Sequence, residues 1–113
     1  MIINETELIA TIRSIPDFPK EGILFRDITT LLKNADAYET LVESIAEKLR
    51  PLDVDIVIGP EARGFVIGSA VAYAVHAGFV LARKPGKLPC EVNSVSYGLE
   101  YGSDRLEIHK DAI

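Results

Sequence analysis

The amino-acid sequence predicts an α/β fold built around a parallel βαβ unit. Two short apolar segments, residues 54–58 and 79–83, flank an Ala/Val-rich stretch at 65–77 that has the length of a helix. A strand, a helix and a second strand within about 30 residues form a βαβ unit with a right-handed crossover. The 113 residues suffice for one domain, and 48% of them are apolar, which is enough to bury a core.

The N-terminal segment predicts a short helix followed by irregular chain. Asn4 is a good N-cap, and Glu7 stands at the capping-box spacing from it. The apolar residues that follow lie on one helical face until Pro16 ends the helix: Leu8, Ile9, Ile12 and Ile15. After an irregular stretch at 16–22, the apolar residues 23–32 predict a buried loop or a short strand.

A continuous apolar stripe predicts a second helix over 36–49. Asp36 and Glu39 repeat the capping-box spacing at its start, and Pro51 stops it. The stripe consists of Tyr38, Leu41, Val42, Ile45, Ala46 and Leu49.

The boundaries of the βαβ unit and the segment after it follow from glycine and proline. Gly78 stands where a helix C-cap glycine belongs, so we expect the 65–77 helix to end there. Residues 85–94 contain several proline and glycine residues and are expected to be mobile. Residues 95–101 and 105–109 predict two antiparallel strands joined at 102–104.

Composition excludes several classes of protein. No apolar run reaches the ~18 residues of a transmembrane helix, and the N-terminus has no basic segment followed by an apolar one, as a secretory signal would. The single cysteine, Cys90, cannot form an internal disulfide, which favours the reducing cytoplasm. A net charge of −5 argues against a nucleic-acid-binding protein.

The basic residues are concentrated in one part of the chain. Residues 62–90 contain four basic and no acidic side chains, so this stretch carries +4 and the remainder −9. Arg63 follows the first strand of the βαβ unit, Arg83 and Lys84 end the second, and Lys87 comes shortly after. Ligands of parallel sheets bind at the carboxyl ends of the strands, and a helix N-terminus there favours an anion. The pattern predicts a phosphate or pyrophosphate site, and the alternative is a set of solvated surface cations.

Other candidate residues each have two interpretations. Glu100 has aromatic neighbours that can raise its pKa for general acid or base catalysis, or it is a polar residue on the wet face of a strand. Phe25 beside Arg26 can stack on a planar base, or it packs in the core. Cys90 and His76 have no partners in the sequence that would indicate a thiol protease or a zinc cluster.

Four segments in the same order resemble motifs of the adenine phosphoribosyltransferases. They are FPKEGILFRDIT at 18–29, GPEARGF at 59–65, RKPGKLP at 83–89 and LEYG at 99–102. The resemblance implies an incomplete type I phosphoribosyltransferase fold, Rossmann-like, with antiparallel flap strands. Residues 1–113 are then one domain, with an N-terminal base-binding helical hood at 1–35, the βαβ core at 36–84 and the flap strands at 85–113.

The resemblance also implies an activity. Members of the family are pentosyltransferases (glycosyltransferases) of purine salvage, which make AMP and pyrophosphate from adenine and phosphoribosyl pyrophosphate. Mg²⁺ accompanies phosphoribosyl pyrophosphate, with few or no direct protein ligands expected in this chain. A cytoplasmic homodimer that binds neither nucleic acid nor membranes is expected.

Site residues are implied by matching positions. Phe25 resembles the ring that stacks on adenine, with the backbone of Leu24 and Arg26 reading its edge. Glu100 resembles the glutamate that moves a proton at the purine, and Tyr101 the tyrosine beside it.

The implied pyrophosphate site has two parts. Glu61, Ala62 and Arg63 match the loop that cradles pyrophosphate, where the family implies a strained peptide that can be cis without a proline. Arg83, Lys84 and Lys87 match its pyrophosphate-binding cations, some of them supplied across a dimer interface. The stretch 85–95 corresponds to the mobile flap.

One family motif is missing from the sequence. No apolar strand leads into two acidic residues and a Gly/Thr-rich loop, which in the family hold the 5′-phosphate and ribose. In the family this motif lies just beyond the position that residue 113 occupies, so we expect a truncated chain that is inactive alone. The alternatives are a non-catalytic module that binds purine or phosphate, and a fragment that needs a partner chain.

Overall fold

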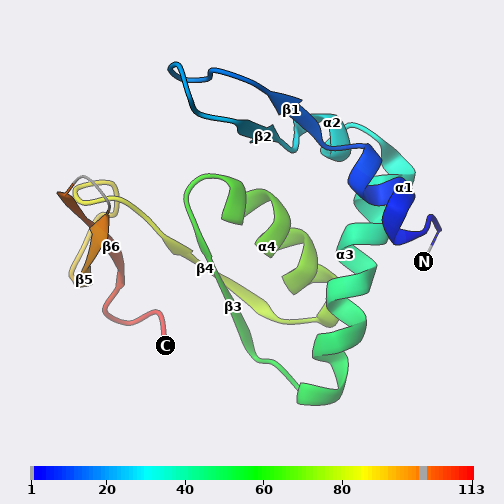
Figure 1. Cartoon of the computed structure of the whole chain (residues 1–113). Coiled ribbons are helices and arrows are strands. Elements are labelled where there is room, and N and C mark those ends of the chain that lie inside the picture. The colour runs from blue at the N-terminus through cyan, green and yellow to red at the C-terminus, as the bar shows by residue number, and fades with distance from the viewer. Residues whose placement is uncertain (1, 100–101) are drawn as a thin grey trace. The chain divides into compact units, whose positions relative to one another are not determined.

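The structure is a computed structural model that describes residues 2–99 and 102–113. It consists of two compact units, an N-terminal unit (Met1–Lys48) and a C-terminal unit (Leu49–Ile113). Figure 1 shows the succession of helices and strands within each unit. The expected α/β class is confirmed. Among the described residues, no helix is long and apolar enough to cross a bilayer.

The first helix is shorter than the sequence predicts. The capping box is confirmed, because Asn4 Oδ1 accepts a hydrogen bond from Glu7 N at 2.8 Å and Glu7 Oε1 accepts one from Asn4 N at 3.5 Å. Helix α1 (Glu5–Ala10) then ends well before Pro16. The expected continuation to Ile15 is wrong, because strand β1 (Arg13–Ile15) pairs antiparallel with strand β2 (Phe25–Asp27).

A buried carboxylate explains this strand pair. Asp27 is 7% exposed and lies opposite Arg13 in the register. Its Oδ2 accepts hydrogen bonds from Arg13 Nη2 at 2.5 Å and Nε at 3.0 Å, and its Oδ1 accepts from Thr29 N at 2.8 Å and Oγ1 at 2.6 Å. These bonds, from the Thr29 hydroxyl first and then from Arg13, lower the pKa of Asp27 from 3.8 to about 2. A buried charge needs such partners, and helix α2 (Thr29–Leu32) begins directly after it.

Helix α3 (Ala35–Leu49) confirms the helix expected over 36–49. Its cap differs from the expectation, since the side chain of Asn34, and not that of Asp36, accepts a hydrogen bond from Ala37 N at 3.1 Å. Asp36 lies in the first turn, where its charge suits the helix dipole. The 3₁₀ turn η1 (Arg50–Leu52) follows and contains Pro51.

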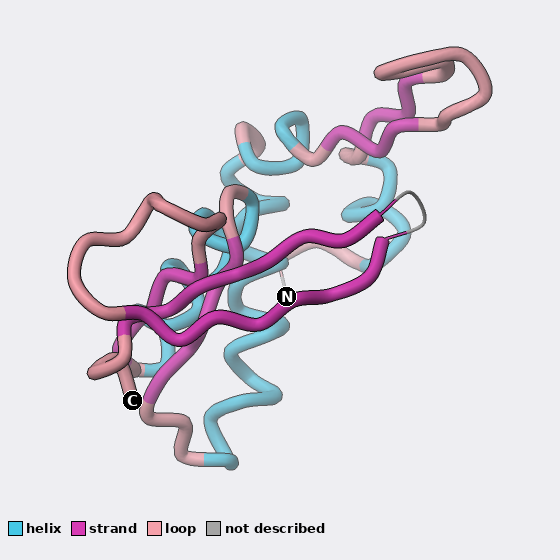
Figure 2. The backbone as a smooth tube through the Cα atoms, turned by 90° about the vertical axis from the view of Figure 1, so that its left-hand side faces the viewer, coloured by secondary structure: helices cyan, strands magenta, loops and turns pink. Residues whose placement is uncertain are grey.

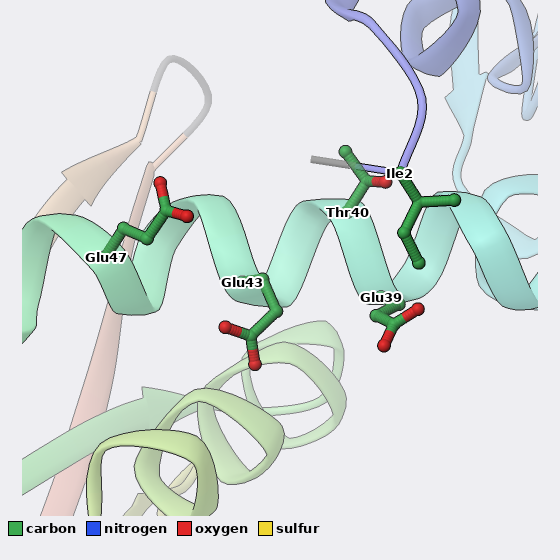
Figure 3. A pocket seen from close by; sticks show the side chains of 5 residues that line it. All are labelled: Ile2, Glu39, Thr40, Glu43 and Glu47. Atoms are coloured by element: carbon green, nitrogen blue, oxygen red, sulfur yellow. The ribbon is translucent and has the colours of Figure 1, made fainter.

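The N-terminal segment lies along α3. Ile3 N donates a hydrogen bond to the hydroxyl of Thr40, which is fully buried, at 3.2 Å. Figure 3 shows the hollow beside this contact, about 220 Å³ in volume, which is lined by Ile2 and Thr40 and by three glutamates of α3: Glu39, Glu43 and Glu47. The acidic lining makes this hollow a poor place for an anion.

The βαβ unit is confirmed in the C-terminal unit. Strands β3 (Ile56–Pro60) and β4 (Gly78–Ala82) are parallel, with helix α4 (Arg63–Val75) between them in the chain. The register pairs Ile56 with Gly78 and Pro60 with Ala82, so both strands end side by side. Strand β3 is shifted two residues from the expected 54–58, because its pairing continues to Pro60.

The C-cap of α4 is not the glycine that the sequence suggests. His76 is the C-cap residue and adopts a left-handed conformation with φ of 60°. Ala77 N then donates to Ala72 O at 2.8 Å, which closes the helix end. Gly78 N donates to Asp55 O at 2.9 Å and opens β4, so the role expected for Gly78 is wrong.

Two long strands complete the C-terminal unit. Strands β5 (Val92–Leu99) and β6 (Gly102–His109) form the expected antiparallel pair, and Figure 2 shows them side by side. Both are longer than predicted, and the expected turn residues 102–104 belong to β6. The pair is joined to the end of β4 by a bridge between Arg83 and Glu107.

We predict that Asp27→Asn lowers the urea midpoint of unfolding at pH 7. Because the pKa of Asp27 is lower in the folded than in the unfolded chain, the ionised carboxylate stabilises the fold fully above about pH 4, and this contribution disappears as the pH falls toward 2. The difference in midpoint between the wild type and D27N should therefore be largest at pH 7 and shrink below pH 4. Asp55→Asn, at an exposed carboxylate, is the control, and a difference that does not change with pH would contradict the prediction.

Candidate anion-binding site

The loop between β3 and α4 is tightly packed. A Cβ atom on Gly59 would lie 2.4 Å from Gly64 O and 2.6 Å from Phe79 Cζ. One on Gly64 would lie 2.5 Å from Pro60 Cδ. Only glycine therefore allows the end of β3, the start of α4 and the Phe79 ring to approach this closely. The Glu61–Ala62 peptide between them is cis, as the family resemblance implies for this loop.

Glu61 ties this loop to the end of β4. Its backbone N–H donates to Ala82 O at 3.0 Å, and its Oε1 accepts hydrogen bonds from Lys84 N at 2.7 Å and Arg83 Nε at 3.3 Å. The Lys84 amide and the Arg83 charge lower the pKa of this carboxyl below its ordinary value. Glu61 is therefore ionised at neutral pH and connects the two loops that follow the parallel strands.

Arg83 contacts three residues: Glu61, Phe65 and Glu107. Besides the bond to Glu61, its guanidinium carbon lies 5.9 Å from the centre of the Phe65 ring, within cation–π distance. Phe65 in turn meets Phe79 edge to face, with ring centres 6.3 Å apart. The backbone of Arg83 exchanges two hydrogen bonds with that of Glu107, at 2.9 and 2.8 Å. Arg83 thus has a structural role in addition to any contact with a ligand.

Three further cations surround this junction. Arg63 is the first residue of α4, and its side chain is exposed, as are those of Lys84 and Lys87. None of the three forms an ion pair with a described residue. The N-cap residue, Ala62, makes no side-chain cap within the described chain, and Phe65 N donates to Ala62 O at 3.1 Å. The first turn of α4 therefore has no capping side chain among the described residues, and its dipole favours an anion. Cationic side chains and a helix N-terminus at one sheet edge form an arrangement that suits a phosphate or pyrophosphate group.

The expected purine-contacting residues lie in the N-terminal unit. Phe25 is half-buried in β2 and meets Phe18 edge to face, with ring centres 5.2 Å apart. Leu24 is 52% exposed and lines an open hollow of about 210 Å³. Arg26 donates from Nη1 to the Ser14 hydroxyl. Phe25 is thus only partly packed, and its neighbours Leu24 and Arg26 are exposed residues.

Two expected site residues, Glu100 and Tyr101, lie outside the described residues. Tyr97, the aromatic residue that precedes them in the sequence, pairs with Asp104 across the β5–β6 ladder. Burial and the Asp104 carboxylate raise the pKa of Tyr97 above its ordinary value, so its hydroxyl stays protonated at neutral pH.

Comparison with known proteins shows what the chain is similar to. No family model matches the chain. The chain is 61% identical over 102 residues to the adenine phosphoribosyltransferase of Alkaliphilus metalliredigens. The aligned residues make up 90% of this chain and 60% of that protein. The chain is homologous to the adenine phosphoribosyltransferases. It spans less than two thirds of the length of the curated relatives that it matches.

Solved structures of adenine phosphoribosyltransferases share the fold. The enzyme from Thermoanaerobacter pseudethanolicus is 53% identical, with a TM-score of 0.89 over 95% of this chain and 62% of that one. The enzyme from Saccharomyces cerevisiae is 39% identical, with a TM-score of 0.88 over 96% of this chain and 64% of that one. It was solved with adenine and D-2,5-dideoxy-2,5-imino-altritol 1,6-bisphosphate. The expected type I phosphoribosyltransferase fold is confirmed over the part that this chain spans.

Sequence reasoning missed the residues that hold the adenine phosphoribosyltransferase motifs in place. The side chain of Glu107 and the ring of Phe65 contact the segment around Arg83. Glu107 lies outside all four motifs, and Phe65 belongs to the one at 59–65 but had no role assigned. Glu61 was expected to contact pyrophosphate, whereas its carboxylate is already bonded to Lys84 and Arg83. One signal was present: Glu61 is the last acidic residue before the basic stretch 62–90.

We predict that Gly59→Ala destabilises the chain by about 1–3 kcal/mol, since the new methyl group overpacks the contact between the loop and Phe79. Gly98→Ala is the matched control, because a Cβ there meets nothing within 4 Å, and it should change the free energy of unfolding by less than about 0.5 kcal/mol. Urea unfolding followed by circular dichroism measures both. Equal effects of the two substitutions would mean that the loop is not tightly packed.

Proposed function

We propose that this chain is part of an adenine phosphoribosyltransferase, which transfers the 5-phosphoribosyl group from phosphoribosyl pyrophosphate to adenine and releases pyrophosphate. The observation that supports this most strongly is the basic edge, which consists of Arg63, Lys84 and Lys87 beyond the ends of β3 and β4. It occurs in a chain that is 61% identical to an adenine phosphoribosyltransferase. Its products, AMP and pyrophosphate, place the reaction in purine salvage.

The basic edge would bind the leaving group. Loss of pyrophosphate from the anomeric carbon builds positive charge on the sugar and negative charge on the departing oxygens. Arg63, Lys84 and Lys87 can hydrogen-bond those oxygens, and the N-terminus of α4 adds a favourable dipole. The tight packing of the loop before α4 holds this helix end in place before the reaction, so its dipole acts without reorganising.

Magnesium belongs to the substrate in this proposal. Within the described residues there is no group of three or more His, Cys, Asp or Glu side chains that could hold a metal ion. The donor set here, cations and backbone N–H groups, suits the phosphate oxygens instead. Mg²⁺ bound to the diphosphate would neutralise part of its charge, while Arg63 and Lys84 contact the remaining oxygens.

The purine would be held by the N-terminal unit. The half-buried Phe25 can stack its ring on adenine, with the backbone of its exposed neighbours Leu24 and Arg26 reading the edge of the base. Glu100 is the proposed acid or base that manages the proton of the purine as the glycosidic bond forms. A lid formed by 85–95 would exclude water from the sugar cation. The active enzyme is proposed to be a cytoplasmic homodimer.

We predict that the 113-residue chain binds inorganic pyrophosphate and that Arg63→Ala weakens this binding by about tenfold, the value of one charged hydrogen bond. Lys84→Ala should act in the same direction. Lys110→Ala removes an equally exposed cation whose 3.8 Å ion pair is with Glu91, and it should leave the affinity within about twofold. Isothermal titration calorimetry measures the three affinities. Equal losses in all three variants would indicate non-specific attraction.

Turnover tests the proposal as a whole. The 113-residue chain alone should form no AMP from adenine and phosphoribosyl pyrophosphate, because none of its segments matches the 5′-phosphate loop. A chimera that continues it with the remaining segment of the Alkaliphilus relative should form AMP, and Glu100→Ala in that chimera should lower kcat more than it raises KM. If the chimera is active and E100A leaves its kcat unchanged, Glu100 takes no part in the chemistry. AMP formation by the short chain would disprove its inactivity.

A further inference from the structure

The two lysines of the basic edge are presented by one tight turn. Lys87 N donates to Lys84 O at 3.3 Å, which closes a four-residue turn. Pro85 and Gly86 occupy the central positions, and Gly86 has a φ of 81°. Proline followed by a left-handed glycine is the pattern of a type II turn, whose first and last Cα atoms lie within about 7 Å. The turn therefore brings the backbones of Lys84 and Lys87 close together.

A carboxylate from β6 holds the middle of this turn. Glu107 Oε1 accepts a hydrogen bond from Gly86 N at 3.2 Å. The same residue pairs through its backbone with Arg83, directly before the turn, at 2.9 and 2.8 Å. Glu107 thus contacts the residue before the turn through its main chain and the turn itself through its side chain. Glutamine and alanine both keep these main-chain groups, so the contribution of the side chain can be tested separately.

We propose that Glu107 is a positioning residue of the anion site: its carboxylate fixes the turn at 84–87 so that Lys84 and Lys87 face the same anion. This rests on the proposed function, which assigns the two lysines to pyrophosphate. An acidic group beside an anion site would otherwise be a disadvantage, because its charge repels the ligand. Its presence is explained if the hydrogen bond to Gly86 N contributes more to affinity than the repulsion removes.

Glutamine and alanine separate these two effects. In E107Q the side-chain carbonyl can still accept from Gly86 N, whereas the charge is gone. In E107A both are lost. The positioning role predicts that E107A binds inorganic pyrophosphate about fivefold more weakly than wild type, the value of one hydrogen bond. E107Q should bind at least as tightly as wild type. Glu91→Ala removes an exposed carboxylate that lies outside the turn, and it controls for the change in net charge.

The test combines calorimetry with amide exchange. Isothermal titration at low ionic strength gives the pyrophosphate affinity of each variant, and hydrogen exchange followed by NMR reports the protection of the Gly86 amide. We expect Gly86 to exchange about fivefold faster in E107A and at the wild-type rate in E107Q. Unchanged affinity in E107A, or tighter binding in E107A than in wild type, would overturn the proposal.

The readouts also separate failure of this proposal from failure of the proposed function. If the wild-type chain does not bind pyrophosphate, the anion site itself is wrong, and the Gly86 exchange rates alone decide whether Glu107 holds the turn. If the wild type binds and Gly86 exchanges equally in all variants, the anion site stands and the role of Glu107 is refuted.

Discussion

The carboxylate of Glu61 is the contact on which the C-terminal unit depends. Parallel strands bring their carboxyl ends together, but the chain leaves each end in a different direction. Glu61 follows β3 and accepts hydrogen bonds from Lys84 N and Arg83 Nε, which follow β4. One ionised group therefore connects the segment after β3 to the segment after β4. The partners on either side also lower its pKa, so the connection is intact throughout the neutral range.

Periodicity in the sequence was sufficient to find the main elements of this fold. Helix α3 and the parallel pair of β3 and β4 lie close to their predicted positions, because their apolar patterns describe one buried face. The errors come from partners distant in the sequence. The spacing of Ile12 and Ile15 fits a helix, yet the ion pair of Arg13 with Asp27, 14 residues later, selects a strand. At the end of α4, His76 takes the left-handed C-cap position that the sequence predicted for Gly78.

The sequence predicted where the basic residues of the candidate site lie, but not the contacts that orient them. The basic residues 63, 83 and 84 reach one sheet edge because strand ends of a βαβ unit always meet there. The contacts that orient them could not be anticipated, since Glu107 is 24 residues from Arg83 and meets it only through an isolated backbone bridge. The acid-free stretch from 62 to 90 indicated where the cations gather, but it contained no information about which acidic groups outside it would hold them.

The turn at 84–87 also affects whether the chain loses its conformational entropy when it folds or when an anion binds. A flexible loop with two lysines would have to be ordered when the ligand arrives, and that ordering would subtract from the affinity. Pro85 restricts its own backbone even in the unfolded chain, and Gly86 adopts the required conformation without steric strain. Most of the conformational freedom is therefore given up during folding. Affinity for an anion at this edge is thus partly a property of chain stability, so that substitutions which remove no charge can still weaken binding.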